Sequence, residues 1–299
     1  MQSIRNSVLF CCLFWPLVGS ATVGVVATTP SLGALVRAVG GEHVSVKTLA
    51  APTSDPHFVD GRPSFVVALN RADLLVRVGL ELETGWLPGL VAQARNSEIL
   101  PSKAGDFDAS TAAGPLLGVG ASTDRRLGDV HGAGNPHYLF DPRMGVNVAL
   151  ALAARLSALD PEHKSSYERR ASNFKRVMLR RIADWQSRLK PLAGKPIVTF
   201  HDSFGYVARW VGLTVTGHIE ALPGVPPTAK HLAGLILKMR RLSVGVIVSE
   251  AWYDAETARV VASKTGAKLI RLPGDVGAPG IGSYPDLIEH IVQGLESAL

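Results

Sequence analysis

Cysteine is almost absent from the sequence, and its scarcity restricts the chemistry of the chain. The only two cysteines, Cys11 and Cys12, lie within the first 20 of the 299 residues. If that segment is removed, the chain has no thiolate for a metal site and no disulfide, although exported proteins are able to form disulfides. Histidine and carboxylate then remain as the strong side-chain ligands for a transition metal.

A hydrophobic run long enough for a permanent membrane anchor is also missing at the N-terminus. The apolar run from Ser7 to Val18 is shorter than the roughly 20 residues that span a bilayer, and Pro16 interrupts it. A basic residue precedes the run and small residues follow it, which is the pattern of a cleaved secretory signal peptide. We therefore predict that residues 1–20 are a signal peptide and that the mature protein is periplasmic or otherwise extracytoplasmic.

Aromatic residues are scarce, at 6% of the chain, while the formal net charge is +6. Lys and Arg are densest between Lys164 and Lys190, on a stretch with helical periodicity, and no aromatic platform for base stacking accompanies them. A solvated helix face explains the charge better than nucleic-acid binding, which we do not expect. The 46% hydrophobic content is enough for a large core, and the length favours roughly two domains.

Short apolar runs alternate with helical patterns in both halves of the chain, which predicts an α/β fold. We expect two Rossmann-like lobes, each a mainly parallel sheet with flanking helices. The predicted strands are 23–27, 44–49, 74–78, 197–200, 213–216, 244–249 and 268–272. Residues 104–135 show no sustained period and are interpreted as a long loop.

One long helix is predicted to join the two lobes. Asp160-Pro161 is a start signal, and apolar residues then recur at spacings of three and four up to Leu189. A helix of about 28 residues reaches roughly 40 Å. The predicted organisation is an N-terminal lobe at 21–160, a rigid connecting helix at 161–192 and a C-terminal lobe at 193–299.

Three of the nine histidines occur in polar turn contexts, namely Asp55-Pro56-His57, Asn135-Pro136-His137 and Phe200-His201-Asp202. Proline fixes its own φ angle and restricts the preceding residue, so it can present an imidazole rigidly. His57 and His201 also follow predicted strands, and open α/β sheets bind ligands at the carboxyl ends of their strands. Each histidine alone is more typical of a cap or a core contact than of a ligand, but the three together predict a metal site.

Several motifs follow one another along the mature chain. The first half contains Asp55-Pro56-His57, Arg62-Pro63-Ser64, Ala72-Asp73-Leu74-Leu75, Gly79-Leu80-Glu81-Leu82-Glu83, Gly134-Asn135-Pro136-His137-Tyr138 and Asp141-Pro142. The second half contains Thr199-Phe200-His201-Asp202-Ser203-Phe204-Gly205-Tyr206, Gly224-Val225-Pro226-Pro227-Thr228 and Gly282-Ser283-Tyr284. In these motifs the sequence resembles the metal-specific solute-binding proteins of ABC importers, which take up zinc, manganese or iron.

The resemblance implies a metal in the cleft between the lobes, bound by two residues from each. His57, His137 and His201 match three ligand positions of that family. Asp275 matches the fourth, although the short glycine-rich loop after it departs from the family pattern. Two other acidic residues are alternatives at this position: Glu250, and Asp202, which we expect instead to orient the His201 ring.

The implied function is capture of one divalent transition metal ion and its delivery to an ABC permease, by a protein that we expect to be a monomer and not an enzyme. Three imidazoles and one carboxylate suit zinc, whereas manganese favours more oxygen ligands. Zinc is therefore the first choice, with manganese or iron as the alternative. The histidine-rich loop frequent in zinc members is absent, since residues 104–135 contain only His131 before the site motif. A secreted zinc hydrolase is a remote alternative, because no His-Glu-x-x-His helix is present.

Overall fold

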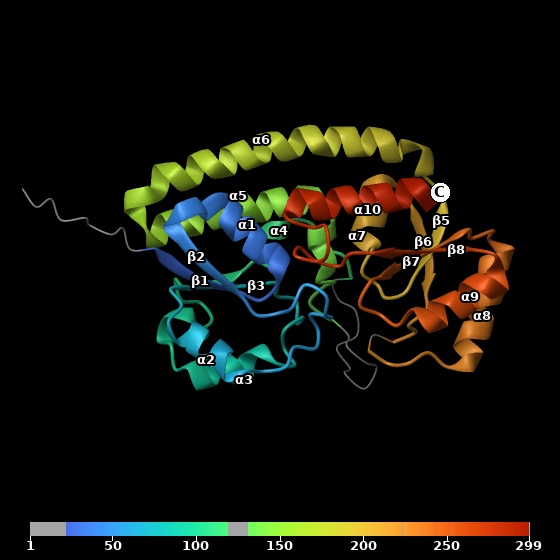
Figure 1. The fold of residues 1–299 in the computed structure, drawn as a ribbon, viewed down its shortest axis with the longest axis horizontal. Coiled ribbons are helices and arrows are strands. Elements are labelled where there is room, and N and C mark those ends of the chain that lie inside the picture. The colour runs from blue at the N-terminus through green and yellow to red at the C-terminus, as the bar shows by residue number, and fades with distance from the viewer. Residues whose placement is uncertain (1–21, 119–130, 223, 299) are drawn as a thin grey trace, which may run out of the picture.

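Two four-stranded parallel sheets form the framework of the molecule, as predicted (Figure 1). The structure is a computed structural model that describes residues 22–118, 131–222 and 224–298. The predicted signal peptide and both cysteines lie outside these residues. Within the described ranges, no helix combines the length and the apolar character needed to cross a bilayer.

The first sheet has the strand order β2-β1-β3-β4. Its strands are β1 (Val23–Ala27), β2 (Val44–Thr48), β3 (Leu74–Arg77) and β4 (Asp106–Asp108). Side chains alternate across β1, so that Val25 packs toward α1 and α5 while Val26 packs with α2 and α3 on the other face. The helices are α1 (Pro30–Gly40), α2 (Pro63–Asn70), α3 (Leu87–Ala94) and α5 (Pro142–Leu159).

The second sheet repeats this plan with the order β6-β5-β7-β8. Its strands are β5 (Pro196–Thr199), β6 (Thr214–His218), β7 (Val246–Glu250) and β8 (Lys268–Leu272). Val198 and Ile247 pack against α8 and α9, whereas Ile197 and Val248 face the other side. The helices are α7 (Gly205–Val211), α8 (Ala229–Arg241), α9 (Ala255–Thr265) and α10 (Tyr284–Ala298).

The long helix α6 (Lys164–Leu189) runs along both halves of the molecule, as Figure 1 shows. Its 26 residues span roughly 39 Å. Its buried side chains recur at helical spacing, and they are Tyr167, Ala171, Met178, Ile182, Trp185 and Leu189. They belong to one continuous core that includes residues of both sheets, so the two halves are packed on the same helix. Trp185 Nε1 also donates to Glu289 of α10 at 2.6 Å.

The predicted loop at 104–135 contains regular structure that the sequence pattern did not reveal. Its described part includes β4 and the short helix α4 (Ser110–Ala113). The prediction of a loop throughout is therefore wrong for residues 106–113, and residues 119–130 lie outside the described ranges. β4 was missed because it is a three-residue edge strand with two aspartates, which Arg77 of the neighbouring strand binds at 2.9 and 2.7 Å.

Candidate metal centre

Three histidines from distant parts of the sequence meet between the two sheets. His57 lies in the loop after β2, His137 begins the 3₁₀ turn before α5, and His201 follows β5. One ring nitrogen of each lies within 4.8 Å of those of the other two. The ring centroids are 5.0–5.3 Å apart. The structure thus brings together the three histidines that the sequence singled out.

The turn that carries each first-half histidine also orients its ring. The Asp55 carboxylate accepts hydrogen bonds from the His57 backbone N–H at 3.0 Å and from Nδ1 at 2.6 Å. The Asn135 side-chain oxygen does the same for His137, with both distances 2.9 Å. Because Nδ1 donates to oxygen in both rings, Nε2 keeps its lone pair, which is the form that binds a metal.

His201 is oriented by a residue far along the chain. Its Nδ1 lies 2.9 Å from Glu220 Oε2, on the segment that follows β6. The expectation that Asp202 orients this ring is wrong, because Glu220 holds Nδ1, and the Asp202 carboxylate lies instead 3.9 Å from Nε2 of His218. Asp202 instead accepts a hydrogen bond from Asn135 through its backbone carbonyl, at 2.6 Å, which links the second half to the His137 turn.

Burial and neighbouring charges give His137 and His201 different proton affinities. Burial lowers the pKa of His137 well below its usual value, and the neighbouring histidines lower it further. Burial also disfavours a proton on His201, but the hydrogen bond to Glu220 and the charge of Glu250 prevail and raise its pKa. A proton therefore competes with a metal ion more strongly at His201 than at His137.

Asp275 occupies a different position in the site. Its carboxylate accepts hydrogen bonds from Ser31 Oγ and from the Val276 backbone N–H at 2.8 Å. It lines the same cavity of about 50 Å³ as His137, but its oxygens are not in the group of ligand atoms that lie within 4.8 Å of one another. Burial raises its pKa to about 7. The residue before Asp275 must be glycine for the backbone to pass this close to Trp252, since a β-carbon on Gly274 would lie 1.9 Å from the Trp252 ring.

Glu250, the other acidic alternative, is a buried neighbour of His201. Ser203 Oγ donates to its Oε1, and burial raises its pKa to about 7. Its charge acts on His201 and it is not in the three-histidine group. Glu250 thus contributes negative potential beside the ring that the metal would bind.

The chemistry of these donors fits a divalent transition metal, and comparisons with known proteins point the same way. The model of the family described as "Zinc-uptake complex component A periplasmic" matches residues 25–298. The chain belongs to this family. Within it, the chain is similar to the high-affinity zinc uptake system protein ZnuA of Yersinia pestis, with 26% identity over 83% of this chain and 81% of that protein. The ZnuA of Paracoccus denitrificans is 28% identical over 92% of this chain and 91% of its own length.

The fold of this family member is also found in a solved structure. The cadmium-bound periplasmic metal binding protein of Candidatus Liberibacter asiaticus superposes with a TM-score of 0.76. The match covers 91% of this chain and 98% of that one, at 19% identity. A structural similarity at this identity supports the two-sheet fold only. Which metal the site prefers has to be inferred from the ligand atoms of this chain.

Sequence reasoning missed two residues of the site, Glu220 and His131. The Nε2 atom of His131 lies 3.2 Å from Nε2 of His57. Burial lowers the pKa of His131 to about 4, and the nearby histidines contribute to this. No local pattern marks either residue: Glu220 is 19 positions from the ring that it orients, and His131 precedes a glycine-containing turn without proline.

Proposed function

We propose that this protein captures a divalent transition metal, zinc first, outside the cytoplasm and delivers it to the membrane permease of an ABC importer. The observation that carries the proposal is the convergence of three imidazole nitrogens within 4.8 Å of one another. Membership of the zinc-uptake component family supports the transport role. The periplasmic location named by that family supports the predicted export.

The ligands in this proposal are His57, His137, His201 and Asp275. The three rings are supported by their mutual distances and by the oxygens that hold each Nδ1, which leave Nε2 for the ion. Asp275 is supported by its burial and by the cavity that it shares with His137. Ser31 Oγ and the Val276 backbone N–H both donate to Oδ1 of Asp275, so the carboxylate can bind the ion through Oδ2 and keep these hydrogen bonds.

Zinc is preferred over manganese because the donor set is rich in nitrogen. Zinc accepts imidazole and carboxylate in tetrahedral geometry at roughly 2.0–2.2 Å. At a common site manganese ranks below zinc in affinity, and it relies more on oxygen ligands. A manganese- or iron-specific protein of the same family remains the alternative, in which Asp275 and Glu250 would provide more of the binding energy.

The ion is proposed to lie between an N-terminal lobe at 21–160 and a C-terminal lobe at 193–299, joined through residues 161–192. A site divided between two lobes suits capture and release, because relative movement of the lobes changes the number of ligands that reach the ion. We expect the protein to act as a monomer. A metal hydrolase would need an open coordination position and a nearby general base, so hydrolase assays on the zinc-loaded protein separate the two functions.

The decisive experiment is measurement of metal content and affinity on protein purified without added metal. We expect zinc to co-purify at one ion per chain, and zinc to displace manganese in a competition titration. A triple variant with alanine at positions 57, 137 and 201 should retain the fold and lose the ion. Zinc binding that survives in that folded variant would rule out this site as the site of capture.

A further inference from the structure

His131 faces the metal centre from the turn that precedes the His137 motif. Its Nε2 lies 3.2 Å from Nε2 of His57, and the two ring centroids are 5.3 Å apart. This is the same spacing that separates His57 from the other two rings, at 5.2 Å for His137 and 5.3 Å for His201. His57 is therefore surrounded by three imidazoles at equal distances.

The separation of these two nitrogens fits two ligands of one ion. Zinc binds imidazole nitrogen at roughly 2.0–2.1 Å in tetrahedral geometry, which places two bound nitrogens about 3.3 Å apart. The observed distance is 3.2 Å. Nδ1 of His57 already donates to Asp55, so its Nε2 lone pair points toward His131 and toward the space between the rings. The His131 nitrogen is not within 4.8 Å of the nitrogens on both His137 and His201, so ligation requires a displacement of its ring toward them.

The turn that carries His131 is anchored to the first sheet. The backbone N–H of Gly132 donates to Glu81 Oε2 at 2.9 Å. Glu81 and Leu80 both have left-handed backbone conformations, with φ angles of 69° and 52°. Such conformations are unfavourable for these residues and persist only where surrounding contacts impose them.

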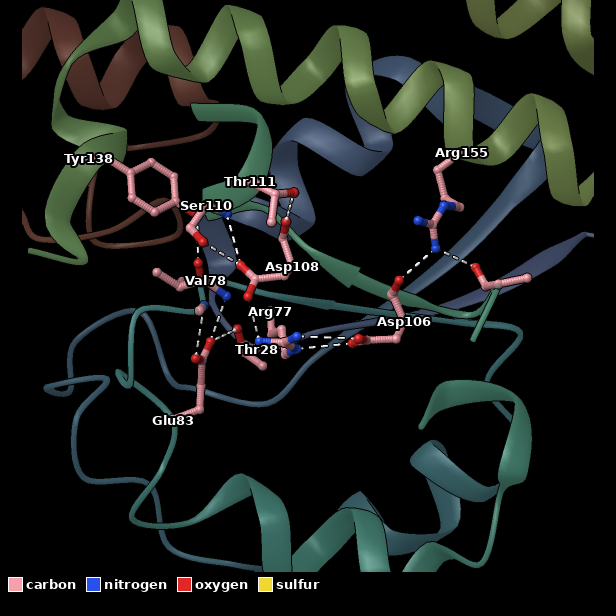
Figure 2. Close-up of polar contacts among 12 residues, drawn as sticks. Thr28, Arg77, Val78, Glu83, Asp106, Asp108, Ser110, Thr111, Tyr138 and Arg155 are labelled. Atoms are coloured by element: carbon pink, nitrogen blue, oxygen red, sulfur yellow. Dashed lines mark hydrogen bonds and ion pairs between the residues drawn. The ribbon is translucent and has the colours of Figure 1, made fainter. Parts of the chain in front are cut away.

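Glu83 imposes this conformation on the loop. Its buried carboxylate accepts hydrogen bonds from the backbone N–H groups of Val78 at 2.6 Å and Gly79 at 3.1 Å. It also accepts one from the Thr28 hydroxyl at 2.7 Å, which ties the loop to the end of β1 (Figure 2). The same sheet thus fixes Glu83, the loop that presents Glu81, and through Gly132 the position of His131.

We propose that His131 is a further ligand of the transported metal, and that Glu81 is the residue that positions it. In this arrangement His131 joins His57, His137, His201 and Asp275 around the ion, and Asp275 can bind while its Oδ1 keeps the hydrogen bond from Ser31. An additional imidazole nitrogen in the shell favours zinc over manganese. This inference rests on the proposed function, because it concerns the same ion.

The test compares zinc and manganese affinities of the full mature chain with those of His131→Ala, and uses cobalt as a spectroscopic probe of the shell. We expect His131→Ala to weaken zinc binding by at least about tenfold and manganese binding by less, so that the ratio of the two affinities falls. The visible absorption of bound cobalt, which depends on the number and type of ligands, should change. Glu81→Ala should produce a smaller change in the same direction, and Glu81→Gln, which keeps an acceptor for Gly132, should restore much of the zinc affinity.

His290→Ala is the matched control, since His290 lies on α10 and its Nδ1 bonds the Asp286 backbone carbonyl at 2.9 Å. It should leave both affinities unchanged. A His131→Ala variant with wild-type zinc affinity and an unaltered cobalt spectrum overturns the proposal. So does a cobalt spectrum that changes in Asp275→Asn and not in His131→Ala. In either case, loss of binding in His57→Ala still upholds the proposed function, so the two failures are distinguishable.

Discussion

The two halves of the molecule hold the histidines of the candidate site in different ways. In the first half, an Asx residue two positions earlier bonds both the backbone and the ring of His57, and Asn135 does the same for His137. In the second half, His201 is held by Glu220, which comes from the segment after the neighbouring strand. One half therefore uses a local turn and the other uses a tertiary contact.

This difference has consequences for charge as well as for geometry. In the first half, one ring is held by the Asp55 carboxylate and the other by the neutral Asn135 amide. His201, in contrast, lies near the carboxylates of both Glu220 and Glu250. A positive charge, whether a proton or a metal ion, is therefore favoured more at His201 than at His137. The comparison suggests that the first-half turns provide geometry, and that the second half provides negative potential together with its ligand.

The largest effect should come from removal of a ligand ring, and it should be equal in the two halves. His57→Ala and His201→Ala should each weaken zinc binding by more than about 100-fold, because a lost ligand costs more than a lost orienting partner. Isothermal titration with a competing chelator measures this, with His290→Ala as the control. A variant of either histidine that keeps wild-type affinity would remove that residue from the site.

Removal of the orienting oxygens should have the next largest effect and should sharpen the comparison. Asp55→Ala and Glu220→Ala should each cost about 10–100-fold in zinc affinity, as loss of such partners usually does. Asp55→Asn should cost less than about tenfold, because Asn135 already performs the same function in the matching turn. If Asp55→Asn is as damaging as Asp55→Ala, the charge of Asp55 matters more than its geometry.

The pH dependence of zinc binding should report on His201. Metal and proton compete for this ring, so affinity should fall as the pH falls through its pKa, which lies above the ordinary 6.5. The slope should approach about tenfold per pH unit for one displaced proton. Glu220→Gln removes a cause of the raised pKa and leaves burial, so the midpoint should move to lower pH. An unchanged midpoint in titrations from pH 5 to 8 would contradict this assignment.

Asp275→Asn should have the smallest effect on zinc. If Asp275 is a ligand, each half contributes two ligands, and manganese affinity should fall more than zinc affinity, which should fall by less than about tenfold. A zinc-loaded crystal structure provides the direct measurement: a carboxylate oxygen of Asp275 should lie about 2.0–2.2 Å from the ion. A structure in which neither carboxylate oxygen of Asp275 lies within bonding distance of the ion would exclude it as a ligand.

Much of the fold was predictable because its signals are local. Buried parallel strands appear as short apolar runs, so β1 and β8 were predicted with their observed bounds and the other long strands within two residues. The helix α6 was predictable from its apolar stripe, but the Asp-Pro signal marks the 3₁₀ turn Pro161–His163, and α6 itself begins at Lys164. β4 was not predictable, because an edge strand of three residues has too few buried positions to form a pattern.

The candidate site divides in the same way. The sequence by itself determined the two Asx-Pro-His turns, since a side-chain oxygen two residues before a histidine reaches its N–H and its ring through covalent geometry and the fixed φ of proline. Only the tertiary structure decided that Glu220 faces His201, through the parallel pairing of β5 with β6, and that His131 faces His57, through the loop held by Glu81. These contacts join residues 19 and 74 positions apart, and no local spacing encodes a distance that depends on how whole strands and loops pack.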